Sequence, residues 1–262
     1  MQNDHGIFKK LFGPEAKNYT KYRTDYPKEL FDLLTKLLPN KSGKILDIAC
    51  GTGKSTEALV ETGLSVTGCD HDEQMINEAK DQAKIKNLNI EYIVSEAEKL
   101  PFPDQHFDVV TVGTAFHFFV TDLAMSEIKR VLKPNGLFFV YWTLTTKDTP
   151  DEDEIPGSIF RKYNWIKIPP VLRDLKNISE FLNKSGLQNV STVSIPVIYN
   201  TTVEERVGLM TTSGTYELLS TEEKNNFLED IRSVLTEKLG KREYFTLEEE
   251  IQVCYGFVGD FK

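Results

Sequence analysis

Short apolar runs alternate with helix-length segments between residues 44 and 142, and this alternation constrains the fold more than any other feature of the chain. The strand-like runs are KILDIA (44–49), LSVTGC (64–69), NIEYIV (89–94), FDVVTV (107–112) and GLFFVYW (136–142). The helix-like segments are 54–62, 72–86 and 121–132. Strands that alternate with helices of this length are joined by crossovers, which make the strands parallel and place helices on both faces of the sheet. The sequence therefore predicts an α/β fold.

The segments on either side of this alternation are more helical. Residues 14–38 contain two helix-like pieces, the second with Pro27 near its first turn and leucines at helical spacing. After Trp142 the acidic stretch 147–158 reads as a loop or lid. The pattern then predicts a helix over 177–185, a strand over 188–199, mostly helix over 203–239 and a last strand over 253–259. Pro196 indicates a partly exposed or irregular end of the strand that contains it.

Composition excludes several classes of function. The formal net charge is −9, and such a surface repels phosphate backbones, so we expect no nucleic-acid partner. The three cysteines, Cys50, Cys69 and Cys254, lack metal-ligand spacing and fit buried thiols in a reducing compartment. The N-terminus has no continuous apolar signal region, and no apolar run reaches the ~18 residues that cross a bilayer. We expect a cytoplasmic protein without a metal or a membrane partner.

The stretch DIACGTGKST (47–56) allows two interpretations. A phosphate loop of the G-x-x-x-x-G-K-[ST] type needs its first glycine at position 48, where Ile48 stands. A nucleoside site instead needs a tight glycine turn after a strand and an acidic residue about 20 positions further on. Asp70, 19 positions after Gly51, meets that requirement, although it could also cap the next helix. Thr56 replaces the third glycine of a dinucleotide fingerprint, which weakens that version of the site.

Four segments agree in order and spacing with a known family. ILDIACGTGKST, VTGCDHDEQMINEAK, EYIVSEAEKLPFPDQHFDVVTVGTAFHFF and EIKRVLKPNGLFFVYW resemble the class I S-adenosylmethionine-dependent methyltransferases over residues 44–142. The stretches 12–30 and 212–228 resemble the small-molecule subgroup that contains trans-aconitate methyltransferase-like proteins. The resemblance implies a Rossmann-like sheet of seven strands with the last strand antiparallel, and a helical cap over the substrate pocket.

The resemblance also implies a domain layout and a cofactor. Residues 1–40 would form a helical segment over the cofactor site, 41–145 the Rossmann-like core that binds the cofactor, and 146–262 the rest of the same domain with the cap helices and last strands. The cofactor would be S-adenosyl-L-methionine, and the product S-adenosyl-L-homocysteine. We expect a small-molecule acceptor, with carboxylates among the candidates, and a monomer or homodimer. A cofactor-binding protein without catalysis, acting as an interaction module, and a nicotinamide-dependent oxidoreductase are the alternatives.

Roles carry over from the family by position. The residues expected at the cofactor are Tyr19, Arg23, Asp47, Ala49, Gly51, Gly53, Asp70, His71, Met75, Glu96, Ala97, Thr114 and His117. The turn from Ala49 to Gly53, with Asp47, would lie against the methionine part. The family usually has glycine where Ala49 stands, and a methyl group is tolerated there if the backbone keeps a negative φ.

The resemblance assigns the other positions to the nucleoside, to the methyl-transfer face and to the carboxylate end. Asp70 would accept from the ribose, with His71 and Met75 near the ribose or adenine. Glu96 would accept from the adenine amino group, and the Ala97 N–H would meet the adenine ring. Thr114 to His117 would line the methyl-transfer face, with His117 as candidate general base. Arg23, near Tyr19, would pair either with the carboxylate at the methionine end of the cofactor or with an acidic substrate.

Each of these residues also has an ordinary structural interpretation. Met75 fits core packing, Glu96 fits a surface carboxylate, and His117 fits a ring that packs beside the cofactor. Glu98 is expected to be more exposed than Glu96. The front tyrosines, Tyr19, Tyr22 and Tyr26, could simply seat the first helix. Tyr163, Trp142 and Trp165 could line the substrate pocket or pack in the core.

Overall fold

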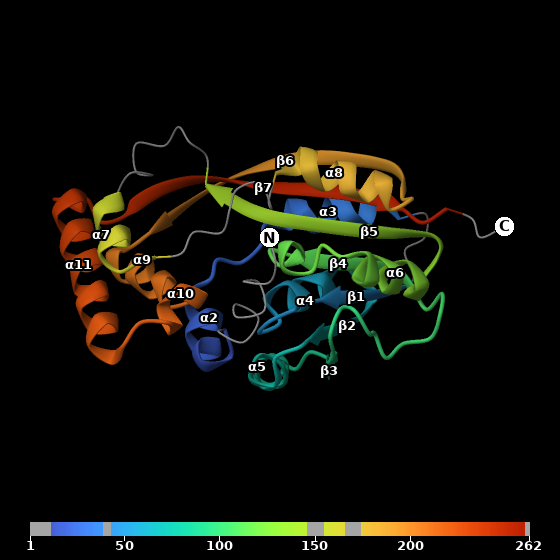
Figure 1. The fold of residues 1–262 in the computed structure, drawn as a ribbon, viewed down its shortest axis with the longest axis horizontal. Coiled ribbons are helices and arrows are strands. Elements are labelled where there is room, and N and C mark those ends of the chain that lie inside the picture. Colours follow the sequence, from blue (N-terminus) through green and yellow to red (C-terminus); the bar gives the residue numbers. More distant parts are fainter. Residues whose placement is uncertain (1–11, 39–42, 146–154, 166–173, 260–262) are drawn as a thin grey trace. The chain divides into compact units, whose positions relative to one another are not determined.

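The computed structural model describes residues 12–38, 43–145, 155–165 and 174–259 (Figure 1). The chain forms two compact units. The core unit consists of residues 25–143, 169–195 and 251–262, and the helical unit of residues 1–24, 144–168 and 196–250. The domain layout expected from the sequence, with boundaries at 40 and 145, stays a prediction.

A seven-stranded sheet carries the order β3-β2-β1-β4-β5-β7-β6. The strands are β1 Lys44–Ile48, β2 Ser65–Asp70, β3 Glu91–Val94, β4 Phe107–Gly113, β5 Leu132–Thr145, β6 Gln188–Thr201 and β7 Phe245–Phe257. Strands β1 to β5 pair in parallel, with Asp47 opposite Gly68 on β2 and opposite Thr111 on β4. Four consecutive residues of β1 are buried, as is typical of a parallel strand covered on both faces. The fold predicted from the alternation is confirmed.

The last strand runs against its neighbour β5. The amide of Asn135 donates to the carbonyl of Val258, and the amide of Val258 donates to the carbonyl of Gly136. The beginning of β5 therefore meets the end of β7, which makes this pair antiparallel. Strand β6, which contains Pro196, lies at the edge of the sheet, the position in a sheet where proline is tolerated.

The last strand begins much earlier than the sequence predicted. It starts at Phe245 rather than at residue 253, and Phe245 and Leu247 are buried while Thr246 and Glu248 are exposed. This is the alternation of a half-buried strand. Acidic residues at 248–250 hid it, because glutamates are more typical of helices than of strands.

The helices of the core unit begin at side-chain caps where the sequence supplies them. They are α3 Lys28–Leu37, α4 Lys54–Leu59, α5 Glu73–Ile85, α6 Asp122–Val131 and α8 Leu175–Lys184, with short 3₁₀ turns η2 Val60–Thr62 and η3 Phe116–Phe118. Asp72 caps α5 by accepting the amides of Gln74 and Met75 at 2.8 and 3.3 Å. The cap is thus Asp72, and the alternative role of Asp70 as helix cap was wrong.

The helical unit has its own apolar core. Its helices are η1 Gly13–Glu15, α2 Ala16–Tyr22, α7 Gly157–Lys162, α9 Val203–Met210, α10 Gly214–Glu217 and α11 Thr221–Leu239. Capping boxes begin α9 and α11. The Trp165 ring stacks on Phe227 with 4.6 Å between centroids, and the Tyr163 hydroxyl donates to Asp230 at 2.8 Å. Both residues pack in this core, and Trp142 is fully buried in the core unit, so the packing interpretation accounts for all three.

Within the part of the chain that the structure describes, no helix is long and apolar enough to cross a membrane.

Candidate functional site

The loops that follow β1, β2, β3 and β4 leave the sheet at one edge, because parallel strands end on the same side. Two hydrogen bonds tie three of these loops together at Asp70. The amide of Gly51 donates to Asp70 Oδ2 at 2.9 Å, and the amide of Ser95 donates to the Asp70 carbonyl at 2.8 Å. The chain runs from β1 to β2 and β3 on one side of the sheet and then to β4 and β5 on the other side of β1. Open α/β sheets bind ligands at such a change of direction. The structure thus brings together the turn at Gly51, Asp70 and the start of the loop that carries Glu96.

The turn after β1 has a left-handed backbone at three positions. Ala49 has φ 56°, Gly51 φ 55° and Gly53 φ 86°. The condition under which a methyl group would be tolerated at Ala49, a negative φ, is therefore not met. A left-handed backbone costs a residue with a Cβ roughly 1–2 kcal/mol, and the glycine that the family usually carries at this position would avoid that cost.

The two glycines of the turn differ in their surroundings. A Cβ built on Gly51 meets no atom within 4 Å, so the space beside its backbone is open. A Cβ on Gly53 would overlap the Tyr92 hydroxyl. The backbone of Gly51 therefore borders open space, whereas Gly53 makes room for a protein side chain at the start of α4.

Asp47 is a fully buried carboxylate surrounded by hydroxyl groups. Its Oδ2 accepts from Ser55 Oγ at 2.8 Å and from Thr56 Oγ1 at 2.7 Å, and its Oδ1 accepts from Thr111 Oγ1 at 2.8 Å. Burial raises the pKa of Asp47 to about 6, against the lowering effect of these three bonds. Ser55 also accepts from the Tyr141 hydroxyl at 2.7 Å. Asp47 thus fastens α4 to β1 and β4 from inside the protein.

This network explains the GKST sequence that resembles a phosphate loop. Ser55 and Thr56 place their hydroxyls on Asp47 instead of on a phosphate or a metal ion. Sequence reasoning did not assign a role to either residue. The signal was a carboxylate at the end of a buried strand followed by two hydroxyl residues in the first turn of a helix.

Asp70 is buried but keeps capacity for a further donor. Its Oδ1 accepts the amide of Asp72 at 2.9 Å and lies 3.1 Å from His71 Nδ1, while its Oδ2 accepts the amide of Gly51. A carboxylate can accept about four hydrogen bonds. Three positions are thus used by neighbours, and one remains that a ribose hydroxyl could fill. The His71 side chain is partly exposed.

The loop after β3 holds Glu96 outward and Ala97 inward. Glu96 is exposed and Ala97 is buried. Glu98 is less exposed than Glu96, so the expected order of these two was wrong. Met75, on α5, is only 3% exposed, which fits the packing interpretation.

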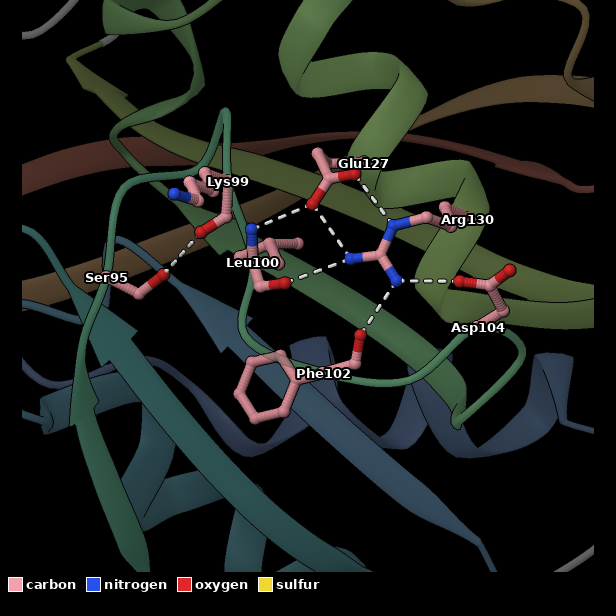
Figure 2. A network of polar contacts seen from close by, with 7 residues as sticks. All are labelled: Ser95, Lys99, Leu100, Phe102, Asp104, Glu127 and Arg130. Atoms are coloured by element: carbon pink, nitrogen blue, oxygen red, sulfur yellow. Dashed lines mark hydrogen bonds and ion pairs between the residues drawn. The ribbon is translucent and has the colours of Figure 1, made fainter.

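Two residues that sequence reasoning missed hold this loop from α6. Figure 2 shows Arg130 and Glu127 directed at the loop, with Arg130 between the Leu100 and Phe102 carbonyls and the Asp104 carboxylate. The only sequence signal was an oppositely charged pair three positions apart on a helix, which is usually a surface feature.

Thr114 sits in a strained conformation directly after β4. Its φ is 57°, which is an outlier for a β-branched residue. Its amide donates to the Tyr141 carbonyl at 2.7 Å, and its hydroxyl lies 3.2 Å from the Tyr26 hydroxyl. Strain of this kind collects at functional sites, and the loop after β4 is one of the four at this edge.

His117 is 4% exposed and receives a hydrogen bond from an indole. Trp142 Nε1–H donates to His117 Nδ1 at 3.4 Å. Because Nδ1 is the acceptor, a neutral ring carries its proton on Nε2, which makes that nitrogen a donor. This arrangement argues against the general-base role and favours a hydrogen-bond donor.

Tyr19 and Arg23 lie together in the helical unit. The Arg23 guanidinium carbon is 5.0 Å from the centroid of the Tyr19 ring, and Nη2 donates to the Thr212 carbonyl at 3.5 Å. The Tyr22 ring fills the space beside Gly208 on α9, so this tyrosine seats α2. Tyr26 belongs to the core unit and packs edge-on against Tyr141.

No group of three or more His, Cys, Asp or Glu side chains among the described residues could hold a metal ion.

Comparison with known proteins identifies the segment around the turn. Residues 46–140 match a family model described as a methyltransferase domain. An uncharacterized methyltransferase of Mycobacterium tuberculosis is 34% identical over 131 residues, 50% of this chain and 51% of the relative. An uncharacterized methyltransferase-like protein of Schizosaccharomyces pombe is 28% identical over 252 residues, 94% of this chain and 92% of the relative. The chain spans about half the length of the first relatives that it matches.

Solved structures agree on the fold. A protein described as a type II methyltransferase, from Anaeromyxobacter dehalogenans, superposes with a TM-score of 0.69 at 20% identity, over 91% of this chain and all of that one. A phosphoethanolamine N-methyltransferase of Haemonchus contortus, solved with phosphomonomethylethanolamine and S-adenosylhomocysteine, gives a TM-score of 0.56 at 20% identity, over 95% of this chain and 58% of that one. The interaction module and the nicotinamide oxidoreductase are not favoured by these findings, and the trans-aconitate-like subgroup stays a prediction. These findings identify residues 46–140 as a methyltransferase domain, in a chain that shares the fold of solved methyltransferases.

Proposed function

We propose that the protein transfers a methyl group from S-adenosyl-L-methionine to a small-molecule acceptor. The observation that carries the proposal is a hydrogen bond between a glycine that borders open space and a carboxylate placed where a ribose hydroxyl could reach it. The Gly51 backbone borders open space, and its amide is bonded to Asp70, which can still accept one donor. A nucleoside needs both features, because its sugar must approach the backbone closely and its hydroxyls need an acceptor.

In this proposal, residues of the core unit would hold the remaining parts of the cofactor. Glu96 and Ala97 would hold the base, with His71 and Met75 beside it, and the turn from Ala49 to Gly53 would border the methionine part. Asp47 would act on that turn from within, through Ser55 and Thr56, since its carboxylate is fully buried. Thr114 and His117 would border the reacting groups.

Methyl transfer requires the protein mainly to position the acceptor relative to the cofactor. S-adenosyl-L-methionine, when bound, supplies a methyl group on a positively charged sulfur. The chain would orient the acceptor in line with that methyl group and exclude water. A carboxylate acceptor needs no base, which suits a His117 whose Nδ1 already accepts from Trp142. Arg23, stacked on Tyr19, would pair with a carboxylate of the acceptor or of the cofactor.

The setting of the reaction is part of the proposal. A chain with a formal net charge of −9 is poorly suited to nucleic acid, so we infer a small soluble substrate. We infer a cytoplasmic protein that works as a monomer or homodimer.

Ligand-dependent thermal unfolding tests the proposal. At 100 times its Kd a ligand adds about 2.7 kcal/mol of stability, which raises the Tm of a domain of this size by roughly 5–10 °C. We expect such a shift with S-adenosylhomocysteine and none with ATP or NAD. A shift with ATP alone would refute the proposal. Carboxylic acids, amines and phenols would then be screened as acceptors by the release of S-adenosylhomocysteine. If no tested compound is methylated although the cofactor binds, the result favours a binding protein without catalysis.

A further inference from the structure

The loop that carries the proposed base-binding residues has no regular structure of its own. Residues 95–106 contain neither helix nor strand. Ligand contacts made from such a loop need the backbone to be held by something else, since an unsupported loop must be ordered at the expense of affinity. The question is what fixes Glu96 and Ala97.

The first anchor of the loop is at its beginning. The amide of Ser95 donates to the Asp70 carbonyl at 2.8 Å, and Ser95 Oγ donates to the Lys99 carbonyl at 3.1 Å. The amide of Lys99 donates to the Glu96 carbonyl at 3.2 Å. Residues 95–99 therefore form a closed turn, and its far end is the residue that precedes Leu100.

The second anchor is an arginine that uses all of its donors. Nε and Nη2 of Arg130 donate to the two carboxylate oxygens of Glu127 at 2.7 and 2.8 Å. Nη2 also donates to the Leu100 carbonyl at 2.9 Å, and Nη1 donates to the Phe102 carbonyl at 2.7 Å and to Asp104 Oδ1 at 2.8 Å. A guanidinium has five N–H groups in a planar fork, and each has an acceptor here (Figure 2).

The sequence LPFP (100–103) prepares the loop for this contact. A residue before proline is restricted to extended conformations, and both Leu100 and Phe102 precede a proline. Carbonyls two residues apart point to the same side of an extended segment. The prolines thus present two carbonyls to one planar group at little further entropic cost. Glu127 completes the contact, because its Oε2 also accepts the amide of Leu100 at 2.8 Å.

We propose that Arg130, oriented by Glu127, is a positioning residue for the base of the cofactor. It fixes Leu100, which closes the turn that holds Glu96 and Ala97, and so sets where the Glu96 carboxylate meets the 6-amino group. The inference rests on the proposed assignment of the base to Glu96 and Ala97. Arg130 itself touches neither the cofactor nor the acceptor in this account.

Arg130→Lys is the variant that tests the inference. Lysine keeps the charge but offers three donors from a single atom, so it cannot join two carbonyls and two carboxylates. The probes are S-adenosylhomocysteine and S-inosylhomocysteine, the analogue with a carbonyl in place of the 6-amino group. We expect the variant to bind S-adenosylhomocysteine roughly tenfold more weakly, within the range of indirect coupling effects, and to bind the analogue about as well as the wild type does. The variant would therefore lose the preference of the wild type for the ligand with the 6-amino group.

A simple loss of stability would give a different result, because it would weaken both ligands equally. Arg232→Lys is the matched control, since Arg232 bridges Glu204 and Glu229 in the helical unit and should leave both affinities unchanged. Glu127→Gln replaces the test variant if Arg130→Lys does not fold, and the same loss of preference is expected.

The possible results separate the inference from the function on which it rests. Equal weakening of both ligands, or no change in Arg130→Lys, overturns the positioning role while cofactor binding stands. A wild type that binds both ligands equally removes the contact with Glu96 and overturns the inference as well. A wild type that binds neither ligand contradicts the proposed function itself.

Discussion

The buried carboxylate of Asp47 should make the protein less stable as the pH rises from 4 to 7. Burial raises the pKa of Asp47 from 3.8 to about 6. Between these two values the folded protein holds the proton more tightly than the unfolded chain does, so the stabilisation is complete at low pH and is lost as the pH rises through about 6. The full difference of about 2.2 units corresponds to about 3 kcal/mol, since one unit is 1.36 kcal/mol. About 2 kcal/mol of it falls between pH 4 and pH 7.

The variant Asp47→Asn isolates this contribution. Asparagine does not titrate and has nearly the same shape. Urea unfolding of the variant and the wild type at several pH values gives two curves, and other titrating groups cancel in their difference. We expect the free energy of unfolding of the variant to gain about 2 kcal/mol relative to the wild type from pH 4 to pH 7. Asp81→Asn, at an exposed position on α5, controls for the loss of one surface charge. Parallel curves for Asp47→Asn and the wild type would refute the reasoning.

Four further substitutions test the turn after β1 and the role of Asp70. Ala49→Gly should raise the free energy of unfolding by about 0.5–1 kcal/mol in urea, because relief of the left-handed backbone exceeds the entropic cost of glycine; a less stable variant would contradict the role of its φ. Gly53→Ala should lower the free energy of unfolding by about 2–3 kcal/mol. Adding Tyr92→Phe to that variant should restore part of the loss, because it removes the overlapping hydroxyl; a double variant that is no more stable would exclude the overlap as the cause. Asp70→Ala should weaken S-adenosylhomocysteine about tenfold or more by calorimetry, and an unchanged Kd would remove Asp70 from the site.

Period and spacing were enough to predict the parallel core. The runs from 44 to 142 are short, apolar and separated by helix-length segments. Each of them coincides with a strand of the structure. The same approach failed at Phe245, where glutamates interrupt the alternation of the strand. Burial on one face, not residue type, decides whether such a segment is a strand, and burial depends on contacts far away in the sequence.

The site was predictable where a role follows from position along the chain and not where it depends on partners. Gly51 and Asp70 could be paired from their spacing, and a hydrogen bond joins them. Arg130 could not be found in this way, because its acceptors are backbone carbonyls that any residue at 100 and 102 would supply. The φ of Ala49 was equally hidden, because the conformation of the turn imposes a left-handed backbone that alanine by itself disfavours.

Asp47 and Asp70 show why a strand-end aspartate cannot be given a role from its position alone. Asp70 is the last residue of β2 and Asp47 the last but one of the neighbouring parallel strand β1. Asp47 lies directly opposite Gly68, two residues before Asp70. Asp47 faces three hydroxyls from α4 and β4, which occupy both of its oxygens inside the protein. Asp70 accepts from the backbone amides of Gly51 and Asp72, in the loops that follow β1 and β2. Backbone donors are present whatever the side chains, so they can hold a carboxylate in place and leave it an open lone pair. The hydroxyls of Ser55, Thr56 and Thr111 therefore decide that Asp47 braces the turn from inside the protein, which leaves Asp70 as the aspartate that we propose for the ligand.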